Sequence, residues 1–309
     1  MFKNIINVNY INKISLILFF FIVFLLLNNL KKEKFKNIKN NSRKLIYLCC
    51  FLKEKYIKEV ELLVKSIFEF GKINNNTDIL IITDYKLKKK FDKLKISKNR
   101  KIKFFILDDI KNIEDACFSR YRIINYNKLQ LYNKILYLDT DIIISNELKS
   151  IFNINPKKFI VLKESYFGHK FHGGLYFPDK IKRKKIHSFS SGIIYFKNTK
   201  DNIKTFQKVL DMKNNKNTII DKFVFDQPVL NYILFNEKKY DNISFGNLVE
   251  NNPQKLVNQV ICHFPGGVGS YKYGKMNKFY NIIKLQKKIH DFLTNYKFKE
   301  KLELDYFYE

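Results

Sequence analysis

The sequence is short of several residue types, and each shortage narrows its interpretation. No tryptophan occurs in the 309 residues, and only five of the 58 basic side chains are arginine. A net charge of +29 ordinarily indicates nucleic acid or an anionic membrane surface as a partner. Because the lysines are scattered along the chain, we interpret the charge as a solvated basic surface. We therefore expect no specific nucleic acid partner, although acidic partners are favoured.

Cysteine is also scarce, and the four that occur lack the spacing of a metal finger. They are Cys49, Cys50, Cys117 and Cys262, with no Cys-x-x-Cys pair among them. The sequence therefore does not predict a cysteine-bound metal, and it leaves the redox compartment open.

Charge is absent from one stretch near the N-terminus, Ile14 to Leu27. It is short for a bilayer, which needs about twenty apolar residues, unless the flanking Tyr10, Ile11 and Leu30 contribute. No small-residue cleavage site follows, which favours an uncleaved membrane anchor over a removed signal peptide. We therefore expect an anchor helix within residues 1–30 and a Lys- and Asn-rich stem over residues 31–43. The sequence does not predict on which side of the membrane the following domain lies, because lysines are common throughout the chain and not only beside the anchor.

From residue 44 onward the chain alternates strand and helix patterns, which predicts an α/β fold. The predicted strands are 44–50, 78–83, 102–107, 134–138, 159–163 and 191–196, and the predicted helices are 58–70, 119–128 and 223–235. We expect one catalytic domain over residues 44–275 and a helical tail over residues 276–309. The apolar residues of that tail either pack on the core or lie on a membrane.

Two acids follow the buried strand pattern at 134–138. Asp139 and Asp141 stand two residues apart at its carboxyl end, where open α/β sheets bind ligands. In an extended chain their side chains point the same way and could share one cation. The alternative is a turn in which each carboxylate caps backbone amides.

Three other segments carry chemistry, namely Arg120 with Arg122, Asp226 with Gln227, and His263 with its glycine-rich tail. Arg120 and Arg122 stand out in a lysine-rich chain, and the planar guanidinium grips phosphate oxygens in a bidentate manner. His263 precedes a Pro and several Gly, and with the two acids it completes a site of two carboxylates and one imidazole, which suits Mn²⁺. The glycines let backbone amides approach phosphate, and Lys272 or Lys275 could add charge. We interpret the remaining histidines of this half as loop residues, namely His169, His172 and His187.

Taken in order, these segments resemble glycosyltransferase family 8, the group of glycogenin and the lipopolysaccharide galactosyltransferases. The markers are the strand at 45–51, FSRYRIINY, KILYLDTDIII, FSSGIIYFKN, DQPVLN and HFPGG with a downstream Lys. The resemblance covers about residues 44–276. It implies a GT-A fold, with a Rossmann-like mixed sheet flanked by helices, and a retaining transfer of a hexose from a UDP-sugar to a glycan, protein or lipid-linked acceptor.

The resemblance also implies a role for individual residues. Asp139, Asp141 and His263 would hold Mn²⁺, and the catalytic group would comprise Arg120, Asp226 and Gln227. The residues that would contact the donor are Cys49, Cys50, Tyr56, Arg120, Asp139, Thr140, Asp141, Ser190, Ser191, Gly192, Asp226, Gln227, Gly266 and Lys272 or Lys275. Two positions depart from the family pattern, since Ser190 replaces the usual Asn and the tail lacks Lys-Pro-Trp.

Two other functions remain as alternatives at this point. The strand followed by DTDII is similar to the nucleophile motif of haloacid dehalogenase phosphatases, but that nucleophile belongs on the first strand, whereas three predicted strands precede these acids. A membrane-tethered basic protein that binds nucleic acid or anionic glycans would explain the charge, but not the DTD, DQ and HFPGG segments together.

Overall fold

The computed structural model describes residues 43–253, 258–266 and 270–306. The predicted anchor and all but the last residue of the predicted stem lie outside the described residues, as do Gly267 and Gly269 of the glycine-rich tail. Within the described ranges, no helix combines the length and apolar character needed to span a bilayer.

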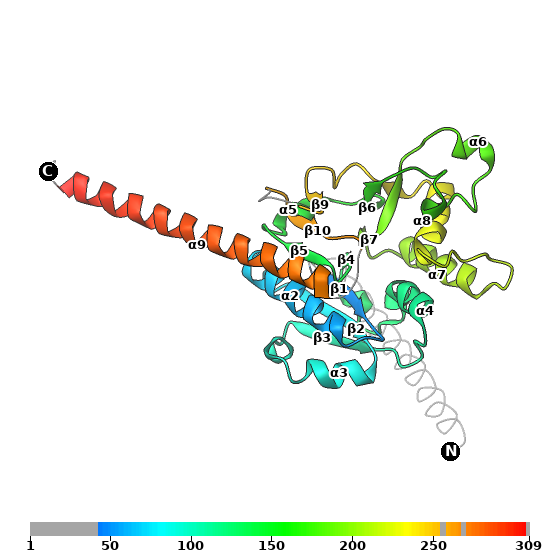
Figure 1. Ribbon diagram of the computed structural model, residues 1–309, viewed down its shortest axis with the longest axis horizontal. Coiled ribbons are helices and arrows are strands. Elements are labelled where there is room, and N and C mark those ends of the chain that lie inside the picture. Colours follow the sequence, from blue (N-terminus) through cyan, green and yellow to red (C-terminus); the bar gives the residue numbers. More distant parts are fainter. Residues whose placement is uncertain (1–42, 254–257, 267–269, 307–309) are drawn as a thin grey trace, which may run out of the picture. The chain divides into compact units, whose positions relative to one another are not determined.

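A seven-stranded mixed sheet forms the centre of the described residues (Figure 1). Its strand order is β3 (Ile102–Ile106), β2 (Thr77–Thr83), β1 (Lys44–Cys50), β4 (Lys134–Leu138), β7 (Ser188–Lys197), β6 (Phe159–Glu164) and β8 (Tyr240–Asp241). The first four strands are parallel, whereas β7 runs antiparallel to both of its neighbours. The mixed sheet confirms the α/β prediction, and β1 and β4 have the predicted bounds.

Three short strands form a second sheet, in the order β5 (Ile142–Ile144), β10 (Ile261–His263) and β9 (Val249–Asn251). The chain leaves β4 at Leu138, turns through the two acids and enters β5. Because β10 pairs antiparallel with β5, His263 stands opposite Ile142, the residue after Asp141. This pairing brings the imidazole to the acid pair from a distant part of the sequence.

The helices cover both faces of the main sheet. The α-helices are α2 (Lys55–Glu69), α3 (Tyr85–Phe91), α4 (Ile113–Phe118), α5 (Lys149–Asn153), α6 (Asp179–Lys182), α7 (Lys200–Asn214), α8 (Asp226–Asn236) and α9 (Ser270–Tyr306). Short 3-10 turns are η1 (Lys95–Lys98), η2 (Ser119–Asn125), η3 (Leu129–Leu131) and η4 (Lys170–His172). The helical stretch predicted around 119–128 is present as the 3-10 helix η2 over Ser119–Asn125, not as an α-helix. Three consecutive buried residues, Ser119 to Tyr121, do not fit one face of an α-helix.

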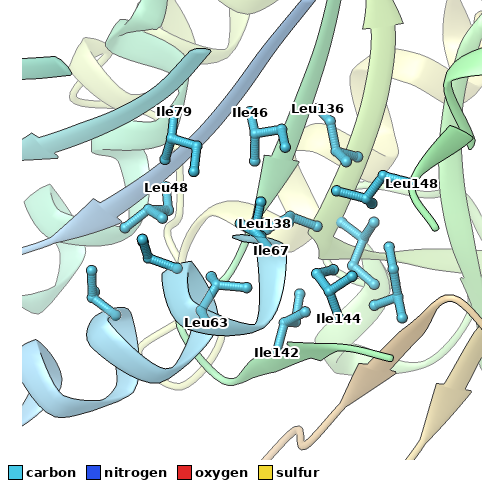
Figure 2. Packing of buried hydrophobic residues seen from close by; sticks show 14 of the residues in the cluster. Ile46, Leu48, Leu63, Ile67, Ile79, Leu136, Leu138, Ile142, Ile144 and Leu148 are labelled. Atoms are coloured by element: carbon cyan, nitrogen blue, oxygen red, sulfur yellow. The ribbon is translucent and has the colours of Figure 1, made fainter. Parts of the chain in front are cut away.

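Alternation along each strand divides the core into two layers. On one face Ile46 and Leu48 of β1 meet Leu63 and Ile67 of α2, and β5 closes this layer (Figure 2). On the other face Leu45 and Tyr47 meet η2, α7 and α8. A third cluster fixes the first part of α9, where Met276, Phe279, Tyr280 and Ile283 pack against α2, β5 and β10.

Candidate active site

The acid pair is held by the backbones of three strands. The N–H of Asp139 donates to the carbonyl of Gly192 on β7 at 2.9 Å, and the N–H of Phe264 donates to the carbonyl of Asp141 at 2.9 Å. A Cβ at Gly192 would lie 2.8 Å from Asp139 Oδ2 and 3.4 Å from His263 Nε2. A side chain at this position would enter the space between the acid and the imidazole and displace the Asp139 carboxylate.

Asp139, Asp141 and His263 converge, each offering a ligand atom within 4.8 Å of the others. His263 Nε2 lies 3.5 Å from Asp141 Oδ1, and its Nδ1 lies 2.9 Å from Asn251 Oδ1 on β9. The amide oxygen of Asn251 can only accept, so Nδ1 carries a proton and Nε2 is the ring nitrogen that faces the acids.

This cluster fits a divalent cation. Asp141 Oδ1 is buried and has no hydrogen-bond partner among the described residues, which is costly for a carboxylate oxygen unless a ligand satisfies it. Two carboxylates and one imidazole form a mixed oxygen and nitrogen donor set of the kind that suits Mn²⁺. The geometry therefore supports a metal centre, in agreement with the family resemblance.

Electrostatics keep Asp141 ionised. Burial alone would raise its pKa, but the neighbouring His263 and Lys272 outweigh this effect and hold the pKa well below its ordinary value. Lys272 Nζ donates to Asp141 Oδ2 at 2.6 Å. The pKa of Asp139, in contrast, is raised by burial despite the nearby Arg120. The two acids of one motif thus have different environments.

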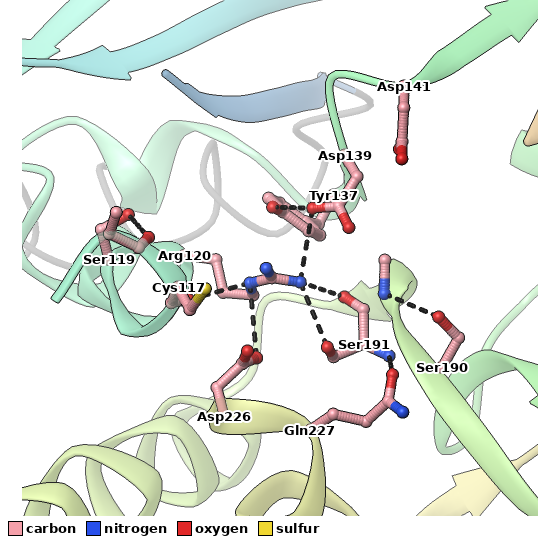
Figure 3. Close-up of polar contacts among 12 residues, drawn as sticks. Cys117, Ser119, Arg120, Tyr137, Asp139, Asp141, Ser190, Ser191, Asp226 and Gln227 are labelled. Carbon is pink, nitrogen blue, oxygen red and sulfur yellow. Dashed lines mark hydrogen bonds and ion pairs between the residues drawn. The ribbon is translucent and has the colours of Figure 1, made fainter. Parts of the chain in front are cut away.

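Arg120 on η2 is the centre of a second polar cluster (Figure 3). Its guanidinium donates to the carbonyl of Ser191 at 2.6 Å, and it lies 3.4 Å from Asp139 Oδ1 and 3.4 Å from Asp226 Oδ2. The guanidinium also stacks over the ring of Tyr137, 4.8 Å from its centroid. Buried between two carboxylates, Arg120 links the start of α8 to the acid pair.

Asp226 and Gln227 begin α8, and both are already engaged. Burial raises the pKa of Asp226 despite Arg120, and Tyr121 OH donates to its Oδ2 at 2.6 Å. Gln227 Oε1 accepts from the N–H of Ser191 at 3.0 Å. Its Nε2 donates to the carbonyl of Phe171 at 3.1 Å and lies 3.2 Å from His172 Nδ1.

A cavity of about 450 Å³ joins the two clusters. Its lining includes most predicted site residues, namely Cys49, Cys50, Tyr56, Arg120, Asp139, Thr140, Asp141, Ser191, Asp226, Gln227, Gly266 and Lys272. Gly192 and Ser190 lie just behind, and the Ser190 hydroxyl accepts from the N–H of Gly192 at 3.1 Å. His263 is not part of this lining and reaches the site through its contact with Asp141. Lys275 lines a separate hollow beside Phe279.

Sequence reasoning missed several residues that shape this site. Glu59 on α2 is buried, accepts from the Thr140 hydroxyl at 3.1 Å, and has a pKa raised by burial. His172, interpreted above as a loop residue, is buried against Gln227. Asn251 orients His263. No spacing in the sequence marks these residues, since each reaches its partner only through tertiary packing.

A family model described as Glycosyl transferase family 8 matches residues 26–273. The chain belongs to this family. No protein with a curated description matches the sequence. Membership favours the glycosyltransferase interpretation over the phosphatase and binding-protein alternatives.

Solved glycosyltransferases have a similar fold. The bifunctional enzyme WbbM is 13% identical with a TM-score of 0.53, over 78% of this chain and 50% of its own, so this chain spans half of that relative. The galactosyltransferase LgtC, solved with donor and acceptor sugar analogues, is 12% identical with a TM-score of 0.52, over 77% of this chain and 95% of its own. At such identities the likeness establishes only the GT-A fold.

Proposed function

We propose that this family member is a retaining, Mn²⁺-dependent transferase that moves a hexose from a UDP-sugar to a hydroxyl group of a glycan, protein or lipid-linked acceptor. The observation that carries the proposal is the convergence of Asp139, Asp141 and His263, with both acids lining one cavity together with Arg120. A nucleoside diphosphate needs a cation, a fixed positive field and a pocket for the base, and the cavity offers residues for each.

The nucleoside end of the donor is assigned to Cys49, Cys50 and Tyr56. Burial raises the pKa of Cys49 to about 12, so this thiol stays protonated and acts as a small neutral contact, not as a nucleophile. The exposed part of the Tyr56 ring supplies an aromatic surface for the base.

Departure of the diphosphate is assisted by positive charge. Bound Mn²⁺ would act as a Lewis acid on the diphosphate oxygens. Arg120 adds a fixed guanidinium that Ser191 and Asp226 hold in place, so it needs no reorganisation during the reaction. Lys272 lines the same cavity and is our choice for the clamp on the diphosphate. Gly266 lies there too, with a positive φ of 74° and open space at its Cβ position.

The donor sugar is assigned to Ser190, Ser191, Gly192, Asp226 and Gln227. Asp226 is buried against Arg120 and Tyr121, and the Gln227 amide is bonded at both ends. Neither group is free to form a covalent intermediate without breaking these bonds. Attack by the acceptor hydroxyl from the face that the diphosphate leaves therefore accounts best for retention.

The same proposal includes attachment to a membrane through the apolar segment from Ile14 to Leu27. Protease protection of a tagged N-terminus in vesicles tests this part separately from catalysis. Release of the full chain by alkaline carbonate would contradict it.

The test of catalysis is a panel of UDP-sugars assayed for hydrolysis and transfer with and without Mn²⁺. We expect Asp141→Ala to lower turnover about a thousandfold, because metal catalysis contributes several kcal/mol. The matched control is Asp109→Ala, which removes an exposed acid paired with Arg122 on the surface. Unchanged turnover in Asp141→Ala, with the fold intact by circular dichroism, would falsify the assignment.

A further inference from the structure

The outer side of α9 carries an apolar stripe that lies outside the core clusters of the described residues. Ile282, Leu285, Ile289 and Leu293 recur at intervals of three or four residues and therefore share one side of the helix. They are 39%, 60%, 51% and 51% exposed. The core-facing side of the same helix is formed by other residues, Met276, Phe279, Tyr280 and Ile283. We call the four exposed residues the outer stripe.

Lysines accompany the outer stripe along its length. From Tyr271 to Thr294 the helix contains six Lys and a single acid, Asp291. Lys278 and Lys288 are exposed, and at about 100° per residue both lie beside the stripe, whereas Asp291 points to the opposite side from Ile282. Lys275, Lys278 and Ile282 also line one hollow together, so the stripe borders a recess that carries two lysines.

The two simplest partners for such a face are a second copy of the chain and a lipid surface, and the charge of the helix decides between them. Pairing of two stripes would bring Lys278 and Lys288 of one copy toward the stripe of another, within a protein of net charge +29. An anionic lipid surface offers the opposite charge and an apolar layer at a depth that suits a helix lying in its plane. Lysine stems can lie along the apolar side chains while their ammonium groups reach the phosphates.

We propose that the outer stripe of α9 docks on a membrane surface that contains anionic lipids. The first turn of the same helix carries Lys272, which lines the donor cavity, so docking fixes the cavity relative to the bilayer. This proposal does not depend on the catalytic assignment or on the N-terminal segment.

The absence of tryptophan allows a direct test with the full chain. Ile289→Trp places a single indole on the outer stripe, and Thr294→Trp places one about 140° away around the helix. Each variant is reconstituted in vesicles of phosphatidylcholine alone or mixed with phosphatidylglycerol, both containing brominated lipid as a quencher. We expect quenching and a blue shift for Ile289→Trp in the anionic vesicles, and neither change for Thr294→Trp.

A second measurement separates the contribution of the lysine charges to docking from that of the buried apolar side chains. Adding Lys278→Gln and Lys288→Gln to Ile289→Trp removes two charges that each contribute about 1 kcal/mol near an anionic surface, so docking should weaken about thirtyfold. Equal quenching at both tryptophan positions, or none at Ile289→Trp, would overturn the proposal. A blue shift of Ile289→Trp that depends on protein concentration and not on lipid would also overturn it, in favour of self-association.

Discussion

The two sides of the 450 Å³ cavity differ in how completely their polar atoms are paired. On the metal side, formed by Asp139, Asp141 and His263, the buried Asp141 Oδ1 has no hydrogen-bond partner among the described residues. On the arginine side, formed by Arg120, Ser191, Asp226 and Gln227, each charged or amide group has protein partners. The first arrangement is incomplete without a ligand, whereas the second is already complete.

This difference indicates a division of labour within one cavity. An unsatisfied carboxylate raises the free energy of the empty protein and is relieved when a cation binds, which favours binding over stability. A satisfied buried network does the reverse, because it holds its groups in one geometry before any ligand arrives. We therefore expect substitutions on the arginine side to affect folding, and substitutions on the metal side to affect binding.

Arg120→Met should have the largest effect on stability. It leaves the buried carboxylate of Asp226 without its cation and removes one of the charges beside Asp139. Breaking a buried ion pair by removing one partner typically lowers the free energy of unfolding by about 3–5 kcal/mol. Urea titration of the wild type and the variant measures this difference.

Arg122→Met is the matched control for that experiment. Arg122 lies on the same 3-10 turn but pairs with Asp109, whose side chain is 63% exposed. Exposed pairs contribute about 0–1 kcal/mol, so the two variants should differ clearly. Equal losses of stability in both would mean that the arginine side does not hold the fold.

The sequence predicts the parts of the fold that a local run of residues determines. β1 and β4 are mostly buried runs of local apolar sequence, so the sequence predicts their bounds and places Asp139 at the edge of the sheet. β5 has only three residues and follows the acid pair directly, so the sequence alone does not decide between an extended chain and a turn at Asp139 to Asp141. Its pairing with β10 was not predicted, although the resemblance had already joined His263 to the two acids.

Contacts between distant segments account for the rest. The choice between Lys272 and Lys275 depends on where α9 begins and which side faces β10, which no local pattern determines. His172 reaches Gln227 across 55 positions of sequence. A buried histidine in a basic loop has the same local sequence as an exposed one, so only the packing of η4 on α8 distinguishes them.

Lys272→Met tests the metal side with a smaller change. Lys272 pairs with Asp141 and so places a positive charge where a cation would be attracted. Its removal should let Mn²⁺ bind about tenfold more tightly in the absence of nucleotide, which corresponds to about 1.4 kcal/mol. Turnover should fall at the same time, because the proposed diphosphate clamp is lost.

Lys275→Met is the control for this titration, since Lys275 follows one helical turn later and lines the other hollow. Isothermal titration with Mn²⁺ alone measures the affinity of both variants. Weaker binding of Mn²⁺ by Lys272→Met than by the wild type would contradict the view that Lys272 competes with the cation.

The smallest effect is expected from substitution of His172 on the arginine side, and it concerns how the free energy of unfolding depends on pH. Burial lowers the pKa of His172, against the charge of Glu164 and together with that of His169, so the folded protein prefers the neutral ring. The unfolded chain therefore takes up this proton first as the pH falls below about 6.5, and the stability contributed by the neutral ring is lost in acid.

His172→Asn keeps an acceptor for Gln227 but cannot titrate. The free energy of unfolding should fall less in this variant than in the wild type between about pH 8 and pH 5. His263 has a pKa raised by Asp141 and responds in the opposite sense, but it is present in both proteins and cancels in the comparison. If the two pH profiles are parallel, His172 does not hold the arginine side through its neutral form.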